Sequence, residues 1–196
     1  MRINLYAQFL ICLSTMFGVL FCNEVRSQAS DTLPPIHLPL ADEDLSLYDF
    51  ASVRMETEKT EIPPADITKR NFQSVKEIFK KDEFHFADSI KSFWIKFQIA
   101  NDQSSDTAVA LRFPQGVAKA VLYKAEGGNL ILIGKTGFFI AVLKRSISYE
   151  DARIDMILKA DSTTEYFIHV ILFNGIWLSK MPVLENVAFA ELNAFR

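Results

Sequence analysis

The sequence predicts an all-β fold, an antiparallel, jelly-roll-like β-sandwich. Apolar and polar residues alternate in several short stretches, and turn-forming residues separate these stretches from one another. The chain contains seventeen Phe but only seven Gly and seven Pro, and aromatic side chains fill the pleated surface between packed sheets well. About seven short strands spaced by turns are typical of a sandwich or jelly roll.

Residues 93–101 form the clearest predicted strand. In an extended chain one side would carry Phe93, Ile95, Phe97 and Ile99, and the other Trp94, Lys96 and Gln98. A strand with one buried face requires this alternation, so we expect the first set in the core. The polar run 101–106 predicts a turn, and the alternating run from Val109 to Phe113 predicts the second strand of a hairpin.

Further strands are predicted by the same alternation. A second hairpin is expected from 117–123 and 130–133, with Glu126-Gly127-Gly128-Asn129 as its turn. A short first strand is expected within 45–55, and others within 138–143, 154–158 and 166–172. Residues 71–81 carry apolar residues at helical spacing, which predicts one short helix of two or three turns.

The first residues have the layout of an export signal. Met1-Arg2 precedes a long apolar run, and small residues follow it, so we expect 1–27 to be a cleaved signal peptide. The alternative is an uncleaved membrane anchor, because the run approaches the length that spans a bilayer. A proline-containing extended lead-in (28–44), a sandwich domain exported to the periplasm or cell exterior (45–190) and a tail (191–196) complete the expected organisation.

Composition and motifs exclude several functions. The formal charge is −3 and no basic cluster is longer than a pair, which disfavours nucleic acid as a partner. The three histidines lack the spacing of a zinc site, both cysteines lie in or beside the predicted leader, and no nucleophile motif is present. We therefore expect no enzyme activity, catalytic residue, metal or cofactor.

Aromatic residues with a polar group are the remaining candidates for binding. Trp94, Tyr123, Arg145 and Trp177 are predicted to border a cleft for a small-molecule or carbohydrate ligand. Trp and Tyr stack on such ligands, and an Arg side chain donates hydrogen bonds to their oxygens. The alternative is structural: Trp94 covers the second sheet or a sheet edge.

A series of short motifs resembles a known family, the extracellular sensor domain, type 2, of bacterial seven-transmembrane receptors with diverse intracellular signalling modules. The resemblance covers about residues 36 to 190. The motifs, in order, are Leu45-Ser46-Leu47, Ser92-Phe93-Trp94-Ile95-Lys96-Phe97 with Asn101, Ala120-Val121-Leu122-Tyr123, Gly134, Lys144-Arg145-Ser146-Ile147 and Tyr166-Phe167-Ile168-His169-Val170.

The resemblance implies a periplasmic jelly-roll domain that senses a ligand for a receptor embedded in the membrane. Family members often have Arg where this chain has Lys96, and they continue into seven transmembrane helices and an output module. This sequence stops at Arg196, so the domain is expected to be a receptor fragment, to act alone, or to signal through a separate membrane partner. The alternative function is a free-standing exported module for carbohydrate binding or adhesion.

The leader gives a direct test. If residues 1–27 are removed on export, protein isolated from the producing cells should begin near Gln28 or Ser30 and remain in the soluble fraction. N-terminal sequencing of both fractions measures this. Protein that retains Met1 and stays with the membranes would instead establish the anchor.

Overall fold

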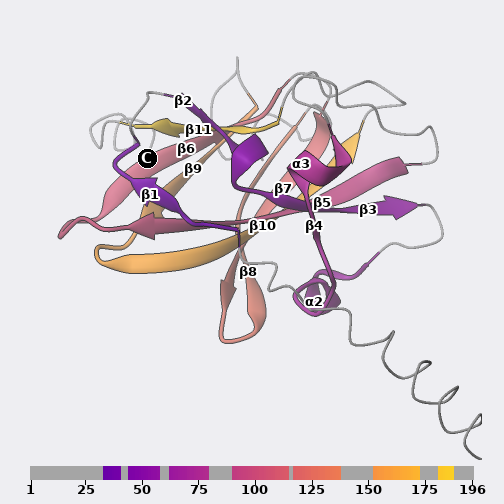
Figure 1. Cartoon of the computed structure of the whole chain (residues 1–196), viewed down its shortest axis with the longest axis horizontal. Coiled ribbons are helices and arrows are strands. Elements are labelled where there is room, and N and C mark those ends of the chain that lie inside the picture. Colours follow the sequence, from indigo (N-terminus) through magenta and orange to yellow (C-terminus); the bar gives the residue numbers. More distant parts are fainter. Residues whose placement is uncertain are drawn as a thin grey trace, which may run out of the picture. The chain divides into compact units, whose positions relative to one another are not determined.

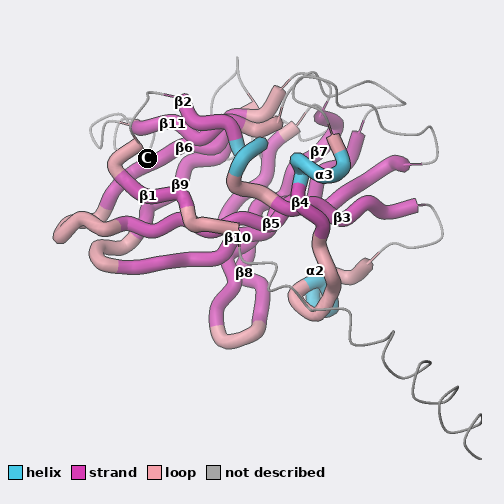
Figure 2. Tube along the Cα trace, in the orientation of Figure 1, coloured by secondary structure: helices cyan, strands magenta, loops and turns pink. Residues whose placement is uncertain are grey.

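The computed structural model describes residues 33–40, 44–57, 62–79, 90–114, 117–137, 152–172 and 181–187. These residues belong to one compact unit, Thr32–Arg196. Two largely antiparallel sheets pack face to face, so the predicted all-β sandwich is confirmed (Figures 1 and 2). No helix in these ranges is long and apolar enough to cross a membrane.

The larger sheet contains seven of the described strands, in the order β4-β3-β5-β10-β7-β8 with β1 beside β5. Their bounds are β1 Ile36–Leu38, β3 Ser52–Thr57, β4 Gln73–Ser74, β5 Ile90–Asn101, β7 Val117–Glu126, β8 Asn129–Thr136 and β10 Ser162–Leu172. The smaller sheet has the order β2-β11-β6-β9. Its strands are β2 Asp44–Ser46, β6 Thr107–Arg112, β9 Arg153–Leu158 and β11 Val183–Asn186.

The main core lies between the two sheets, and the predicted register of β5 is correct. Phe93, Ile95, Phe97 and Ile99 are each at most 2% exposed and belong to this core. The predicted strands at 154–158 and 166–172 are β9 and β10, and their alternating apolar residues also face the core. The predicted strand at 138–143 lies outside the described residues.

A second apolar cluster covers the other face of the larger sheet. It consists of Ile62, Ile67, Phe72, Trp94 and Phe167. The first three come from the segment around the short helix α2 (Pro64–Ile67), which the sequence did not predict. The larger sheet is therefore covered on both faces around Trp94 of β5, by the smaller sheet on one side and by the α2 segment on the other.

The helix expected at 71–81 is much shorter than predicted. Within the described part of this range, 71–79, only α3 (Val75–Ile78) is helical, preceded by β4, and Phe79 is already extended. Phe72 packs in the second cluster whereas Val75 and Phe79 pack in the main core. Since these clusters lie on opposite faces of the sheet, a single continuous helix could not place all three side chains.

The hairpin expected from β5 and β6 is wrong, although both strands exist. β5 pairs with β3 and β10 in the larger sheet, while β6 pairs with β11 and β9 in the smaller one. Ile99 and Val109 face the same interior in this arrangement. Alternation fixes which face of a strand is buried but not which strand lies beside it, so both arrangements fit the sequence.

The structure also shows the outcome for the predicted lead-in and for the second predicted hairpin. The segment 28–44, predicted as an extended lead-in, contains β1, which pairs in parallel with the end of β5, and its Ile36 and Leu38 are buried. The second predicted hairpin is confirmed as β7 and β8. Gly127 and Gly128 form its turn with φ angles of +58° and +81°, which non-glycine residues seldom adopt.

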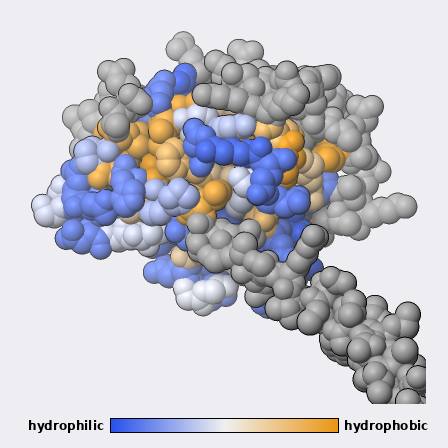
Figure 3. All heavy atoms as spheres, in the orientation of Figure 1, coloured by the Kyte–Doolittle hydropathy of each residue, from blue (hydrophilic) through white to orange (hydrophobic). Residues whose placement is uncertain are grey.

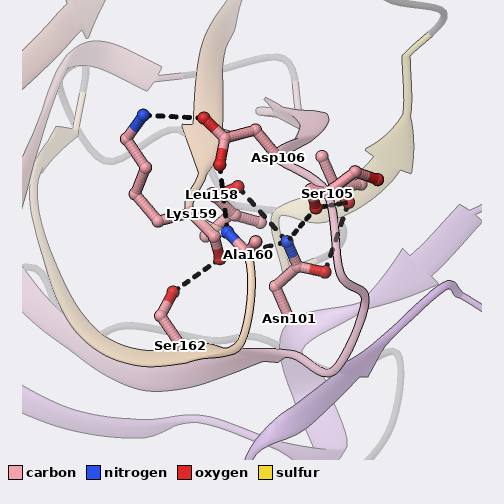
Figure 4. Close-up of polar contacts among 8 residues, drawn as sticks. Asn101, Ser105, Asp106, Leu158, Lys159, Ala160 and Ser162 are labelled. Atoms are coloured by element: carbon pink, nitrogen blue, oxygen red, sulfur yellow. Dashed lines mark hydrogen bonds and ion pairs between the residues drawn. The ribbon is translucent and has the colours of Figure 1, made fainter.

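One buried amide joins the β5–β6 and β9–β10 turns. Asn101 Nδ2 lies 3.0 Å from the Ser105 carbonyl oxygen, 3.3 Å from that of Leu158 and 3.1 Å from that of Lys159 (Figure 4). Beside it, Lys159 Nζ donates to Asp106 Oδ2 at 2.6 Å. On the face seen in Figure 3, hydrophilic residues gather over this end of the sandwich. Asn101 thus fastens one sheet to the other beneath a polar surface.

Replacing Asn101 by Ala should lower the free energy of unfolding by about 2 to 4 kcal/mol, because buried carbonyl groups lose their donor. Urea denaturation measures the change. Ser104→Ala, in the exposed part of the same turn, is the control and should have almost no effect. Equal stability of the two variants would contradict the role assigned to the amide.

Candidate functional site

The structure describes two of the four predicted binding residues. Trp94 has 0% exposure and lies in the second cluster, under the α2 segment. Tyr123 is partly buried beside it, with ring centroids 5.8 Å apart. Arg145 and Trp177 lie outside the described residues. Trp94 therefore offers no ring face to solvent here, and ligand binding by these four residues stays a prediction.

Trp94 belongs to a buried polar network centred on Glu56. The indole Nε1 donates to Glu56 Oε1 at 2.9 Å, and the backbone N–H of Ile62 donates to the same oxygen at 2.8 Å. Ser92 Oγ donates to Oε2 at 2.6 Å, and His169 Nε2 lies 3.0 Å from Oε2. The His169 ring also stacks on Trp94, with centroids 4.4 Å apart and an interplanar angle of 8°.

The strand register explains why these side chains meet. Glu56 on β3 is opposite Ser92 on β5, and Trp94 on β5 is opposite His169 on β10. All four residues point to the outer face of the larger sheet, where the α2 segment excludes water. Nothing in the local sequence around Glu56 marks it as buried, because the alternation of β3 is short and its outer-face residues are polar.

The hydrogen bonds keep Glu56 charged. Burial alone would raise the pKa of its carboxyl group, but the donors from Ser92, Ile62 and Trp94, with His169 nearby, hold this pKa below its ordinary value. A buried carboxylate is tolerated when its oxygens are fully hydrogen-bonded in this way.

The network does not have the arrangement of a nucleophile and its base. Ser92 Oγ and His169 Nε2 both contact the carboxylate oxygen Oε2, so the serine donates to Glu56. A nucleophilic serine instead needs the imidazole as its direct acceptor. Across the described residues, no three His, Cys, Asp or Glu side chains gather as metal ligands. The expectations of no enzyme activity and no cofactor stay predictions.

An open groove lies apart from the Glu56 network, where β7, β8 and β10 of the larger sheet approach β9 of the smaller sheet. It has a volume of about 690 Å³ and is lined by residues of β7 (124–126), β9 (155–157) and β10 (162–166), with Ile133 of β8 and Lys159. We call it the edge groove, because β8 ends the described order of the larger sheet and β9 that of the smaller one.

The edge groove begins where the inward faces of the strands become polar. Along β7 the inward positions run from Ala120 and Leu122 in the core to Lys124 and then Glu126. Along β10 the inward Tyr166 is followed, toward the start of the strand, by Thr164. This change within an alternating strand was the one sequence signal for the groove.

The groove contains charges of both signs, and most of them are paired. Asp155 accepts from Arg153 at 2.6 Å, and Lys159 pairs with Asp106. The Glu165 side chain instead lies on the outer face of the larger sheet, where it pairs with Lys96 at 3.0 Å. Lys124 and Glu126 are only loosely paired, at 3.8 Å, with side chains 32% and 59% exposed.

Tyr166 forms part of the groove lining although the residue is only 3% exposed. Burial raises the pKa of its hydroxyl to about 12, with a hydrogen bond to Thr164 acting in the opposite direction. The hydroxyl therefore stays protonated and neutral in the physiological range. Because Lys124 and Glu126 are only loosely paired, these two side chains and the hydroxyl groups of β10 are polar groups that the groove can offer to a ligand.

Comparisons with known proteins add little. Neither the protein-family models nor the curated proteins give a match. Among solved structures, the native structure of a family 35 carbohydrate binding module from Clostridium thermocellum is similar over 55% of this chain and 80% of its own, with 12% sequence identity and a TM-score of 0.25. Similarity at that level carries no argument about ligand or site.

The Glu56 network predicts a specific pH dependence of stability. A carboxyl group whose pKa falls on folding stabilises the protein above its unfolded-state pKa, and this contribution is lost as pH falls through the folded-state value. Replacing Glu56 by Gln should lower the free energy of unfolding at neutral pH by about 2 to 4 kcal/mol and remove this component of the acid dependence.

Urea denaturation at several pH values checks both effects. Glu77→Gln, on an exposed residue of α3, is the control and should keep the wild-type stability and acid profile. If Glu56→Gln and wild type lose stability in parallel on acidification, Glu56 is not the group that titrates.

Proposed function

We propose that the protein is an exported binding module whose ligand is a neutral, hydroxyl-rich molecule of the carbohydrate class. The observation that carries the proposal is the edge groove, an open volume of about 690 Å³ beside the core of a sandwich. Ligand sites typically have volumes of about 300 to 1,000 Å³ and combine apolar walls with a few placed polar groups. The lining of the edge groove contains both apolar side chains and polar groups.

The charges of the groove favour a neutral ligand. Lys124 and Lys159 are balanced by Glu126 and Asp155, so the lining attracts neither anions nor cations strongly. The inward hydroxyl groups of Ser162 and Thr164 add further polar positions, and that of Ser162, which donates to the Lys159 carbonyl oxygen at 2.7 Å, can still accept. A ligand rich in hydroxyl groups satisfies ammonium, carboxylate and hydroxyl partners together, whereas a simple ion satisfies only one sign.

The order of motifs supports a second, more specific function. We infer from it that the module serves as the extracellular sensor domain of a seven-transmembrane receptor, in which the same ligand would be the signal. The motifs quoted above lie around β2 and on β5, β7, β8 and β10, and the motif at 144–147 lies outside the described residues. Reading the DNA downstream of codon 196 for apolar helices separates a receptor domain from a free-standing module.

The proposed function predicts that a carbohydrate raises the melting temperature of the purified protein, since a ligand that binds only the native state stabilises it. A thermal-shift screen of sugars, with small carboxylic acids as the charged comparison, measures this. The sugars should shift the transition and the acids should not.

Replacing Glu126 by Ala should then weaken binding of the sugar by about 1.5 to 3 kcal/mol, because a charged hydrogen-bond partner is lost. The side chain is 59% exposed, so folding should be unaffected. Calorimetry compares this variant with Glu77→Ala, which lies outside the groove. Absence of any sugar-dependent shift, or equal affinity of both variants, would refute the assignment of the groove.

A further inference from the structure

Several large aliphatic side chains are exposed near the edge groove. Among the described residues the exposed large hydrophobics are Ile131 (43%), Leu132 (54%), Ile133 (39%) and Ile157 (41%). Single exposed apolar residues need no explanation, but apolar surface gathered at a concave site marks a place of binding. Ile133 and Ile157 line the groove, one from each sheet.

Local backbone geometry explains both positions. The pairing of β7 with β8 shifts by one residue after Leu122. Leu122 is opposite Gly134 and Tyr123 is opposite Leu132, so Ile133 is an extra residue of β8 with no partner position on β7. Such a bulge changes the direction of the side chain that it carries. Ile157 occupies the exposed position between the buried Met156 and Leu158 on β9.

The edge groove is consequently amphipathic. Its polar wall comes from Lys124, Glu126 and the hydroxyl groups of β10, and its apolar wall from Ile133 and Ile157. A ligand that is polar all round, such as a free monosaccharide, would leave both isoleucines in water. A ligand with an aliphatic portion would remove them from it, and each buried CH₂ group strengthens binding by about fourfold.

We propose that the ligand of the edge groove is amphiphilic, with a hydroxyl-bearing head on the polar wall and an aliphatic portion between Ile133 and Ile157. This inference rests on the proposed function and narrows its ligand class to glycosides, or related polyols, that carry an alkyl or acyl substituent. Specificity for the substituent then resides in two side chains, and recognition of the head in others.

The test uses methyl, butyl and hexyl β-D-glucosides and the corresponding β-D-galactosides, with binding to the full purified protein measured by calorimetry. Affinity should rise with chain length, by about fourfold for each of the first CH₂ groups that enter the groove. Replacing Ile133 or Ile157 by Ser should flatten this dependence. The thermal transition of each variant verifies that it is folded.

Leu132→Ser is the matched control. It removes an exposed aliphatic side chain from the same strand, but one that does not line the groove, so the dependence on chain length should persist. Methyl glycosides that bind as tightly as hexyl glycosides would overturn the inference while leaving the proposed function intact. A chain-length dependence that survives both Ile variants would also overturn it, and failure of every glycoside to bind would overturn both proposals.

Discussion

Burial of both faces of β5 is the constraint on which the rest of the structure depends. Its odd-numbered residues from Phe93 to Ile99 pack against the smaller sheet, and Trp94 packs under the α2 segment. Moving β5 by one residue relative to its neighbours would exchange these two sets and bring Lys96 and Gln98 into the main core. The strand therefore has one acceptable register, and β3, β10 and β1 take theirs from it.

Much of the fold followed from period-two alternation, which reports directly which face of a strand is buried. The core faces of β5, β9 and β10 were correct for this reason, whereas the β7–β8 turn was predicted from its two glycines. The neighbours of β5 were not predictable, because a hairpin and a crossing between sheets bury the same side chains. Phe72 and Val75 suggested a helix since residues that pack on opposite faces of a sheet can have helical spacing by coincidence.

The candidate site was less visible in the sequence. Trp94 was predicted to lie on an outward face. The segment that covers it begins about thirty residues earlier in the sequence, and only the folded chain brings the two into contact. Glu56 and His169 are 113 positions apart, so no local spacing could have linked them. The edge groove did have a local signal. Lys124 and Glu126 continue the inward-facing positions of β7, which are apolar earlier in the same strand.

The parallel pairing of β1 with β5 has a practical consequence for how the domain is delimited. β10 occupies one flank of β5 along most of its length, so β3 and β1 share the other, with β3 opposite Ile90 to Lys96 and β1 opposite Ile99 to Asn101. A recombinant domain that started at residue 45 would leave the last residues of β5 with an open flank. An open strand edge can pair with other chains and cause aggregation. Starting the expressed domain upstream of Ile36 therefore preserves its solubility as well as its fold.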